Sequence, residues 1–274
     1  MKGRLIDLSI PKIMGVLNVT PDSFYDGGKY SSEDAILHQA EKMLSEGADF
    51  LDIGGYSTRP GAADVSPEDE RARIVKGISV IIRNFPGSII SVDTFRASVA
   101  EAAVECGASI INDVSGGNLD ADMFPTVSRL KVPYILMHMK GNPRDMTSLT
   151  QYDNLIKEIL DYFHQKISAL RNAGVKDIII DPGFGFAKTM DQNFVLLNNL
   201  EKFSLAGKPL LAGLSRKSLI WKTLGVRPAD ALNGTTSLNT IALMKGADIL
   251  RVHDVREARE VVKLFTSLQV NVNP

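Results

Sequence analysis

Polar and charged residues follow most of the short apolar segments of this sequence, and their types could bind a polar ligand. They are Asn18, Ser57 to Arg59, Asp93, Asn112, Asp181, Ser215 with Lys217, and Arg251 with His253. Any one of them has a simple structural explanation, because short polar residues cap helices and form local turns. Seven segment ends that converge on one cavity would leave many buried polar groups unpaired in the absence of a polar ligand. The set therefore predicts a binding site.

The residue types indicate the chemistry of the ligand. Two carboxylates and one carboxamide can accept and donate along the edge of a nitrogen heterocycle, and these are Asp93, Asp181 and Asn112. A second group suits a phosphate or diphosphate, and it consists of Thr58, Arg251, His253 and the loop amides near Gly54 and Gly55. A heterocycle that carries phosphate is the implied class of ligand.

The elements that must position these residues alternate along the chain. Short runs rich in Ile, Val and Leu predict strands over 13–19, 50–53, 89–92, 109–114, 134–139, 178–180, 210–214 and 249–252. Because these runs are continuous rather than alternating, they fit strands that are covered on both faces of a parallel sheet. Amphipathic segments between them predict helices, among them 33–45, 67–84, 97–105, 155–172 and 256–268.

Glycines at the joints before several predicted strands support this alternation. Gly47, Gly107, Gly174 and Gly246 each stand where a helix would end in a left-handed residue, so we interpret them as helix stops. No G-x-G-x-x-G follows the first predicted strand, which disfavours a doubly wound open sheet. Eight β-α units without a break in composition predict an α/β fold, a single-domain (β/α)8 TIM barrel over residues 1–274.

The composition excludes several classes of partner. The 274 residues include 31 Lys and Arg against 32 Asp and Glu, so no net positive charge is present to bind nucleic acid or an anionic membrane surface. No apolar run is long enough to span a bilayer. The single cysteine, Cys106, suits a reducing compartment, and we expect it to be a small buried helix residue. These features predict a cytoplasmic protein that acts on small molecules.

Eight segments carry a resemblance to a known family. In order they are MGVLNVTPDSFYDGG, GGYSTRPG, SVDT, INDVSGG, MHMKGNP, DPGFGFAK, LAGLSRKS and ALMKGADILRVHDV. The series resembles dihydropteroate synthases and covers nearly all of the chain apart from the outer helices. The resemblance implies a transferase of folate biosynthesis, in which 4-aminobenzoate displaces diphosphate from 7,8-dihydropterin-6-ylmethyl diphosphate to give 7,8-dihydropteroate. It also implies a homodimer and a target for sulfonamide analogues of aminobenzoate.

The resemblance further implies a role for each matching residue. The pterin ring would be held by Asp93, Asn112, Asp181 and Lys217, with Met139 and Arg251 against its faces. The diphosphate would meet Thr58, Arg251 and His253, and a Mg²⁺ ion would bind at Asn18. The aminobenzoate would lie near Arg59, Pro60, Phe186 and Ser215. Lys217, Arg251, His253 and Asp93 are accordingly the expected catalytic residues.

Two loops and one departure from the family pattern complete these expectations. Segments 19–30 and 54–65 are rich in Gly, Pro, Ser and Asp, so we predict mobile lids that become ordered with ligand. Tyr56 stands before STRPG where the family commonly has an acidic residue, which puts the contacts of the second lid in question. Of the remaining histidines, His38 and His164 are expected at the surface, and His138 within the fifth strand as a buried supporting residue.

Three other functions fit parts of the pattern. Lys217 could form a Schiff base in an aldolase, but the two carboxylates would then have no role. A pterin-dependent methyltransferase shares the barrel, but no cobalamin module accompanies the barrel in this sequence, and STRPG and GLSRKS favour diphosphate departure and aminobenzoate entry. A non-catalytic pterin-binding paralogue would be indicated by loss of Asn18, Arg59, Lys217 or His253, and all four are present.

Overall fold

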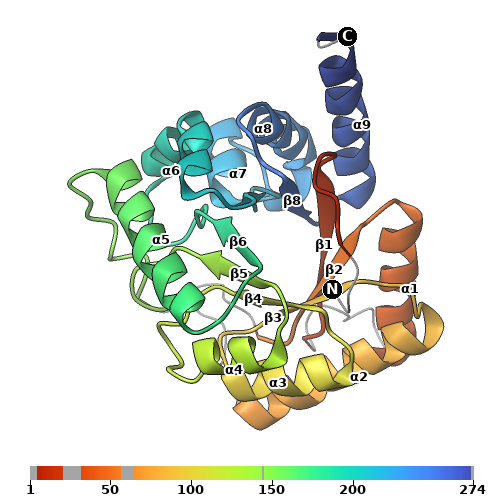
Figure 1. The fold of residues 1–274 in the computed structure, drawn as a ribbon. Coiled ribbons are helices and arrows are strands. Elements are labelled where there is room, and N and C mark those ends of the chain that lie inside the picture. The colour runs from red at the N-terminus through yellow and green to blue at the C-terminus, as the bar shows by residue number, and fades with distance from the viewer. Residues whose placement is uncertain (1–4, 21–31, 57–63, 144, 273–274) are drawn as a thin grey trace.

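The computed structural model describes residues 5–20, 32–56, 64–143 and 145–272, and in them parallel strands alternate with helices (Figure 1). The strands are β1 (Lys12–Asn18), β2 (Phe50–Gly54), β3 (Ile90–Asp93), β4 (Ile110–Asp113), β5 (Tyr134–Met137), β6 (Ile178–Asp181), β7 (Leu211–Ala212) and β8 (Ile249–Val252). They pair in the order β6-β5-β4-β3-β2-β1-β8-β7, and a parallel bridge from Ile180 to Leu210 joins the two ends. The predicted eight-stranded barrel is confirmed.

The strand predictions are confirmed in number and order, with differences at their ends. The fifth strand stops at Met137, so His138 and Met139 follow it rather than lie in it. The seventh strand contains only Leu211 and Ala212. Leu210 lies just before it, where its N–H donates to the carboxylate of Asp248 at 2.8 Å, and Gly213 and Leu214, which were predicted in the strand, follow it.

Helices surround the strands as an outer ring (Figure 1). They are α1 (Ser32–Ser45), α2 (Pro67–Asn84), α3 (Ala97–Cys106), α4 (Met123–Leu130), α5 (Leu155–Asn172), α6 (Met190–Asn198), α7 (Ser218–Leu224), α8 (Leu232–Met244) and α9 (Val255–Val272), with 3-10 helices η2 (Leu200–Ala206) and η3 (Pro228–Asp230). The five predicted helices are confirmed within a few residues of their ends. None of the helices in the described ranges combines the length and apolar character needed to cross a membrane.

The four joint glycines behave as helix stops. Gly47, Gly107, Gly174 and Gly246 have φ between 89° and 122°, a region that side chains with a Cβ rarely adopt. Cys106 ends α3 and is half-buried, with its Sγ 3.2 Å from the Ser79 hydroxyl. At each of the four glycines the chain therefore leaves a helix and turns back toward the start of the next strand.

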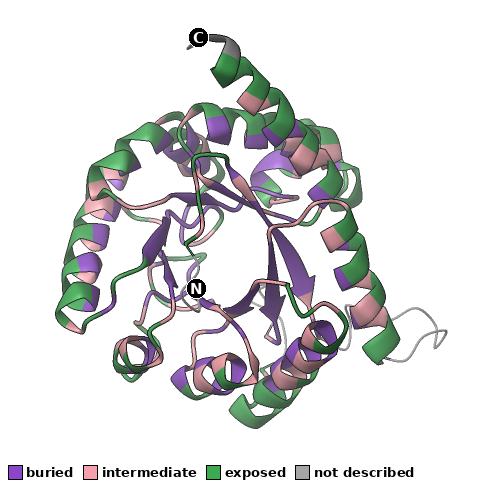
Figure 2. Ribbon diagram, turned by 45° about the vertical axis from the view of Figure 1, so that its right-hand side comes forward, coloured by how far each residue is buried: buried purple, intermediate pink, exposed green. Residues whose placement is uncertain are grey.

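Two apolar layers build the core. The larger layer fills the space between the strands and the helices, where the strands and the inner helix faces are buried and the outer helix faces are exposed (Figure 2). A smaller cluster draws one residue from each of seven strands: Met14, Phe50, Ile110, Ile135, Ile179, Leu211 and Ile249. Because side chains alternate along a strand, these residues point into the barrel and close its lower part.

Candidate active site

A polar layer lies directly above the apolar residues that close the barrel. Two residues after Phe50, Ile110, Ile179 and Ile249, the same inward face carries Asp52, Asn112, Asp181 and Arg251. These four residues belong to β2, β4, β6 and β8, which is the alternate-strand arrangement typical of layers inside such barrels. The local sequence therefore places four polar side chains at one level, at the carboxyl ends of the strands.

Arg251 connects three strands through this layer. Its Nε donates to Asp52 Oδ2 at 2.7 Å, and an Nη donates to Asp93 Oδ2 at 2.6 Å. Asn112 Nδ2 donates to the same Asp52 oxygen at 2.9 Å. Asp52 is fully buried, and its other oxygen, Oδ1, has no hydrogen-bond partner. Asp52 was not among the predicted site residues, although a carboxylate inside the apolar run FLDIG, two residues after the inward-facing Phe50, is a detectable signal.

The charges in this network are unbalanced. One guanidinium faces the carboxylates of Asp52 and Asp93, and these carboxylates raise the pKa of Arg251 although burial opposes them. Burial raises the pKa of Asp93 to about 7; Arg251 opposes this increase, whereas Asp52 adds to it. An anionic, partly protonated floor of this kind suits a ligand with several N–H donors and developing positive charge.

Asn18, Gly54, Asp93 and Asn112 occupy one register row across β1 to β4. A Cβ at Gly54 would stand 3.3 Å from Asn18 Oδ1 and 3.6 Å from Asp93 Cβ, so the absence of a side chain leaves room between Asn18 and Asp93. No group of three His, Cys, Asp or Glu side chains within the described ranges could hold a metal ion. The amide oxygen of Asn18, close to one carboxylate, fits a Mg²⁺ ion that takes its other ligands from water and phosphate.

Lys217 lies on the opposite side of the mouth, against the loop that follows β6. Its Nζ donates to the carbonyl of Phe184 and lies 4.8 Å from the centre of the Phe186 ring. Burial lowers its pKa to about 8, while the carboxylate of Asp181 opposes this shift. Asp181 itself accepts the N–H of Gly183 at 2.8 Å, and burial raises its pKa. Asp181 and Lys217, both predicted to hold the pterin ring, thus each form a hydrogen bond with the loop that follows β6.

The rim of the mouth is built from the end of β8 and the segment after β7. The N–H of His253 donates to Ser215 Oγ at 3.1 Å, and His253 Nδ1 lies 3.1 Å from the same hydroxyl. His253 is exposed and Ser215 is buried, so the hydroxyl orients the imidazole toward the opening. Arg216, between Ser215 and Lys217, turns away and forms a bidentate ion pair with Asp254 at 2.7 and 2.9 Å.

An apolar wall completes the mouth. Met139 is buried in a cluster with Val114, Met137, Met146 and Ala187, against which Phe95 and Phe186 pack. Met139 and Phe186, predicted to contact different substrates, thus belong to one continuous surface. A flat heterocycle and a benzene ring could both lie against it.

The base of the second predicted lid contains a network that the sequence analysis did not predict. Arg96 donates to the Val65 carbonyl at 2.9 Å, pairs with the buried Glu70 at 2.5 Å, and has its guanidinium 5.4 Å from the ring centre of Tyr56. The Tyr56 hydroxyl donates to Asp64 at 3.3 Å. Tyr56 therefore connects the two ends of this segment. Thr58, Arg59 and Pro60, and most of both predicted lids, lie outside the described residues.

The remaining histidines follow the expectations with one correction. His38 and His164 are exposed on α1 and α5. His138 is buried as expected but lies after β5 rather than within it, because the last residue pair between β5 and β6 is Met137 with Asp181. Its ring contacts Lys188, which also went unnoticed in the sequence.

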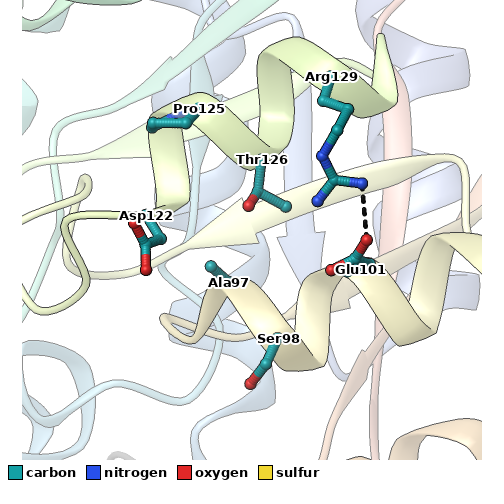
Figure 3. Close-up of a pocket in the computed structure, with 7 residues that line it drawn as sticks. All are labelled: Ala97, Ser98, Glu101, Asp122, Pro125, Thr126 and Arg129. Carbon is teal, nitrogen blue, oxygen red and sulfur yellow. Dashed lines mark hydrogen bonds and ion pairs between the residues drawn. The ribbon is translucent and has the colours of Figure 1, made fainter.

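A surface pocket of about 400 Å³ lies apart from the mouth, between α3 and α4 (Figure 3). Its lining contains none of the predicted site residues and consists of Ala97, Ser98, Glu101, Asp122, Pro125, Thr126 and Arg129. Glu101 and Arg129 form an ion pair of 2.6 Å across it. Because this pocket contains none of the predicted site residues, the polar mouth of the barrel is the candidate active site.

Comparison with known proteins agrees with the fold and the mouth. The model of the family described as pterin binding enzyme matches residues 14–253. The dihydropteroate synthase of Escherichia coli (strain K12) is 42% identical over 270 residues, which cover 96% of this chain and 93% of the relative. Solved dihydropteroate synthases from Xanthomonas albilineans and Yersinia pestis superpose with TM-scores of 0.91 and 0.92 at 38% and 39% identity, with 98% of this chain covered by each and 96% and 98% of those chains.

The barrel and its polar mouth thus define a pterin-binding enzyme. The chain belongs to the dihydropteroate synthase family, with coverage that extends over both halves of the barrel. Its function is accordingly the transferase reaction that makes dihydropteroate in folate biosynthesis.

Proposed function

We propose that the mouth binds 7,8-dihydropterin-6-ylmethyl diphosphate through Asp93, Asn112, Asp181 and Lys217, and joins it there to 4-aminobenzoate. The observation that carries this proposal is the buried polar layer, in which Asp52 Oδ1 is unpaired and Asp93 shares a single guanidinium with Asp52. A ring that presents N–H donors supplies the partners that this layer lacks. The X. albilineans relative has been solved with 4-aminobenzoic acid and with 7,8-dihydropteroate.

The reaction forms one carbon–nitrogen bond and breaks one carbon–oxygen bond. The amine nitrogen of aminobenzoate bonds to the methylene carbon of the pterin, diphosphate leaves with the electron pair of the carbon–oxygen bond, and the amine loses a proton. Asp52 and Asp93 stabilise positive character at the methylene carbon as diphosphate departs. The guanidinium of Arg251, in the polar layer, and the exposed His253 meet the departing anion, and Thr58 is proposed to bind it as well.

Mg²⁺ is the proposed metal, held at Asn18. When it is bound, it neutralises negative charge on the diphosphate. Asn18 lies in the same register row as Asp93, which is proposed to bind the pterin. The diphosphate must lie between the pterin ring and the rim, and therefore close to Asn18.

The aminobenzoate is proposed to lie against Phe186 and the stem of Lys217, with Ser215, Arg59 and Pro60 nearby. The contact of Lys217 with the Phe186 ring, and the position of Phe186 in the apolar wall, support this placement. Sulfonamides, which resemble aminobenzoate, would occupy the same space. The Y. pestis relative has been solved in complex with a sulfonamide drug.

The test is an assay of the purified protein with both substrates and Mg²⁺. Diphosphate release and dihydropteroate formation are followed for the wild type and for Lys217→Ala and Asp181→Ala. We expect product only with both substrates and the metal, and a loss of at least about a hundredfold in kcat/KM for each variant, as is usual when a group that contacts the reacting molecules is removed.

Matched controls separate this result from a general effect of substitution. Lys222→Ala on α7 and Asp191→Ala on α6 change the same residue types at exposed positions, and both should retain wild-type rates. Folded wild-type protein that binds the pterin but releases no diphosphate would defeat the synthase proposal and favour a pterin-binding paralogue.

We also propose a homodimer that forms through α8 and α9, and a cytoplasmic location that agrees with the single cysteine. Ile241 and Met244 on α8 are 41% and 58% exposed, and Leu264 and Leu268 on α9 are 74% and 48% exposed. Exposed apolar side chains on adjacent helices favour association. Sedimentation equilibrium should give twice the mass of the chain, and Leu264→Glu should shift it to the monomer; a wild-type monomer would contradict the proposal.

A further inference from the structure

The loop that follows β6 is held by a buried lysine that the proposed mechanism does not use. Lys188 is 8% exposed, and its Nζ lies 2.9 Å from the carbonyl oxygen of Gly183, 3.0 Å from that of Phe186 and 3.1 Å from His138 Nδ1. Two of these partners are uncharged carbonyl oxygens, and the third is an imidazole nitrogen. An ammonium group has three N–H donors, so three converging acceptors satisfy it completely.

His138 is prepared to accept from this lysine. Burial and the positive charges of Lys188 and Lys140 hold the pKa of His138 well below its usual range, so its imidazole is neutral and Nδ1 can accept. The ring is fixed edge-on against Tyr162, with 4.9 Å between centroids. His138 therefore serves as a rigid acceptor for Lys188.

The backbone of the loop explains why a cation is needed there. Gly183, Gly185 and Ala187 have φ of 72°, 79° and 48°, and this alternation turns the carbonyls of Gly183 and Phe186 toward one point. A Cβ at Gly183 would lie 2.1 Å from the carbonyl oxygen of His138, so the loop packs directly on the end of β5. Two carbonyl oxygens that converge repel each other unless a donor lies between them.

A buried lysine that only stabilised the fold would be energetically unfavourable at this position. Burial lowers the pKa of Lys188 to about 7, an effect that Lys217 and Lys140 reinforce and Asp181 opposes. The buried ammonium is thus poorly tolerated, and an apolar residue would avoid this cost.

The same loop carries two groups of the proposed site. The carbonyl of Phe184 accepts from Lys217, and the ring of Phe186 lies against the same ammonium. Residues 183 and 186, held by Lys188, flank Phe184. Any change in the Lys188 contacts therefore alters where Lys217 and Phe186 stand.

We propose that Lys188, with His138 as its acceptor, is a positioning residue that fixes the Phe184 carbonyl and the Phe186 ring on Lys217, and thereby sets the aminobenzoate side of the site. The proposal rests on the proposed function in assigning Phe186 and Lys217 to aminobenzoate. Its structural half, the control of Lys217 by Lys188, stands on the contacts alone.

The test compares the wild type with Lys188→Met at pH 6.5, where the ammonium form of Lys188 dominates. We expect the KM for aminobenzoate to rise about tenfold or more, because two carbonyls lose their donor, while the Kd of the pterin diphosphate changes less than about threefold. The pterin contacts of Asp93 and Asn112 do not pass through this loop, whereas Asp181 and Lys217 each have one hydrogen bond to it, so the effect on the pterin should be the smaller one. Unchanged KM in folded Lys188→Met would overturn the proposal.

A second pair of variants covers the case in which Lys188→Met fails to fold. His138→Asn keeps an acceptor, Oδ1, near the position of Nδ1 and should retain the wild-type KM, whereas His138→Leu removes it and should raise the KM several-fold. Equal KM values for the pair would overturn the proposal.

Lys245→Met is the matched control for losing a lysine that binds backbone. Lys245 donates to the carbonyl of Asn198 at 2.9 Å, at the opposite end of the barrel. The Lys245→Met substitution should leave the KM for aminobenzoate unchanged. If Lys245→Met raised the KM as much as Lys188→Met, the effect would be one of general stability and the proposal would fail.

A readout without turnover distinguishes failure of this proposal from failure of the proposed function. Labelling of Lys217 by acetic anhydride, followed by peptide mass spectrometry, reports how firmly the Phe184 carbonyl holds its amine. Lys188→Met should label Lys217 several-fold faster than the wild type. Equal labelling rates would overturn the proposal even if the wild type were inactive, and faster labelling would support it in either case.

Discussion

The two ends of the barrel use carboxylates differently. At the end where the strands begin, Asp49 accepts the N–H of Ile13 at 2.8 Å and pairs with Arg259, and Asp248 accepts the N–H of Leu210 at 2.8 Å. Each of these acids joins one strand to its neighbour. Its partners are supplied by the fold.

At the end where the strands stop, the carboxylates have fewer partners than they can use. Asp52 and Asp93 share the Arg251 guanidinium, and one oxygen of Asp52 is unpaired. This difference agrees with the general division of such barrels into a stabilising end and a reactive end. Burial alone therefore does not identify a site residue. A carboxylate that has fewer hydrogen-bond donors around it than it can accept from is the better indicator.

The largest expected effect on stability is that of Arg251→Met. Removal of the guanidinium leaves two buried carboxylates that repel each other, which should lower the free energy of unfolding by about 3–5 kcal/mol. Activity should fall at least about a hundredfold, because the same residue is proposed to meet the diphosphate. Urea denaturation of both proteins at pH 8, above the pKa of Asp93 in the wild type, measures the first effect, and the two-substrate assay measures the second.

Arg259→Met is the corresponding change at the other end. Asp49 keeps the N–H of Ile13 and is partly exposed, so the loss should be about 1 kcal/mol with activity unchanged. Equal losses of stability for the two variants would remove the distinction between the ends.

An intermediate effect is expected from the ionisation of Asp93. Its folded-state pKa of about 7 lies above the ordinary value of 3.8, so between these values the folded protein retains a proton that the unfolded chain has released. The stability from this group is therefore complete below about pH 4 and is lost as the pH rises through 7. Relative to Asp93→Asn, the wild type should lose on the order of 2 kcal/mol over this range.

Urea titrations of both proteins at several pH values between 4 and 8 provide the measurement. The difference between their free energies of unfolding should shrink or reverse as the pH increases. A difference that is constant with pH would mean that Asp93 is ionised throughout, and that the mouth resembles the lower end after all.

Much of the architecture could be predicted from periodicity and glycine placement. The apolar runs gave the eight strands in order because both faces of each strand are covered, and the four joint glycines gave the helix ends. The bounds of β7 were harder to predict. It has only two residues, and the N–H of Leu210 before it donates to the side chain of Asp248. A contact between residues so far apart in sequence leaves no local pattern.

The site was predicted where a polar residue occupies one of the last two positions of a strand, and missed where the residue lies deeper in a strand or further along a loop. Asp93, Asn112, Asp181 and Arg251 stand at strand ends, whereas Asp52 lies inside an apolar run and Lys188 follows a loop of glycines and phenylalanines. The roles of Asp52 and Lys188 depend on acceptors and donors supplied by other strands and loops. Such partners are visible only in the folded chain.

The smallest expected change in stability comes from a matched pair of substitutions, Asp248→Asn and Asp181→Asn. Each carboxylate accepts one backbone N–H at 2.8 Å, and burial raises the pKa of each. An amide oxygen can accept the same hydrogen bond without a buried charge, so each variant should lose less than about 1 kcal/mol of unfolding free energy. Activity should separate them, because Asp248→Asn retains the wild-type rate and Asp181→Asn loses most of it. Wild-type activity in Asp181→Asn would show that a carboxylate at the mouth is as replaceable as one at the base, and the comparison between the two ends would then describe stability alone.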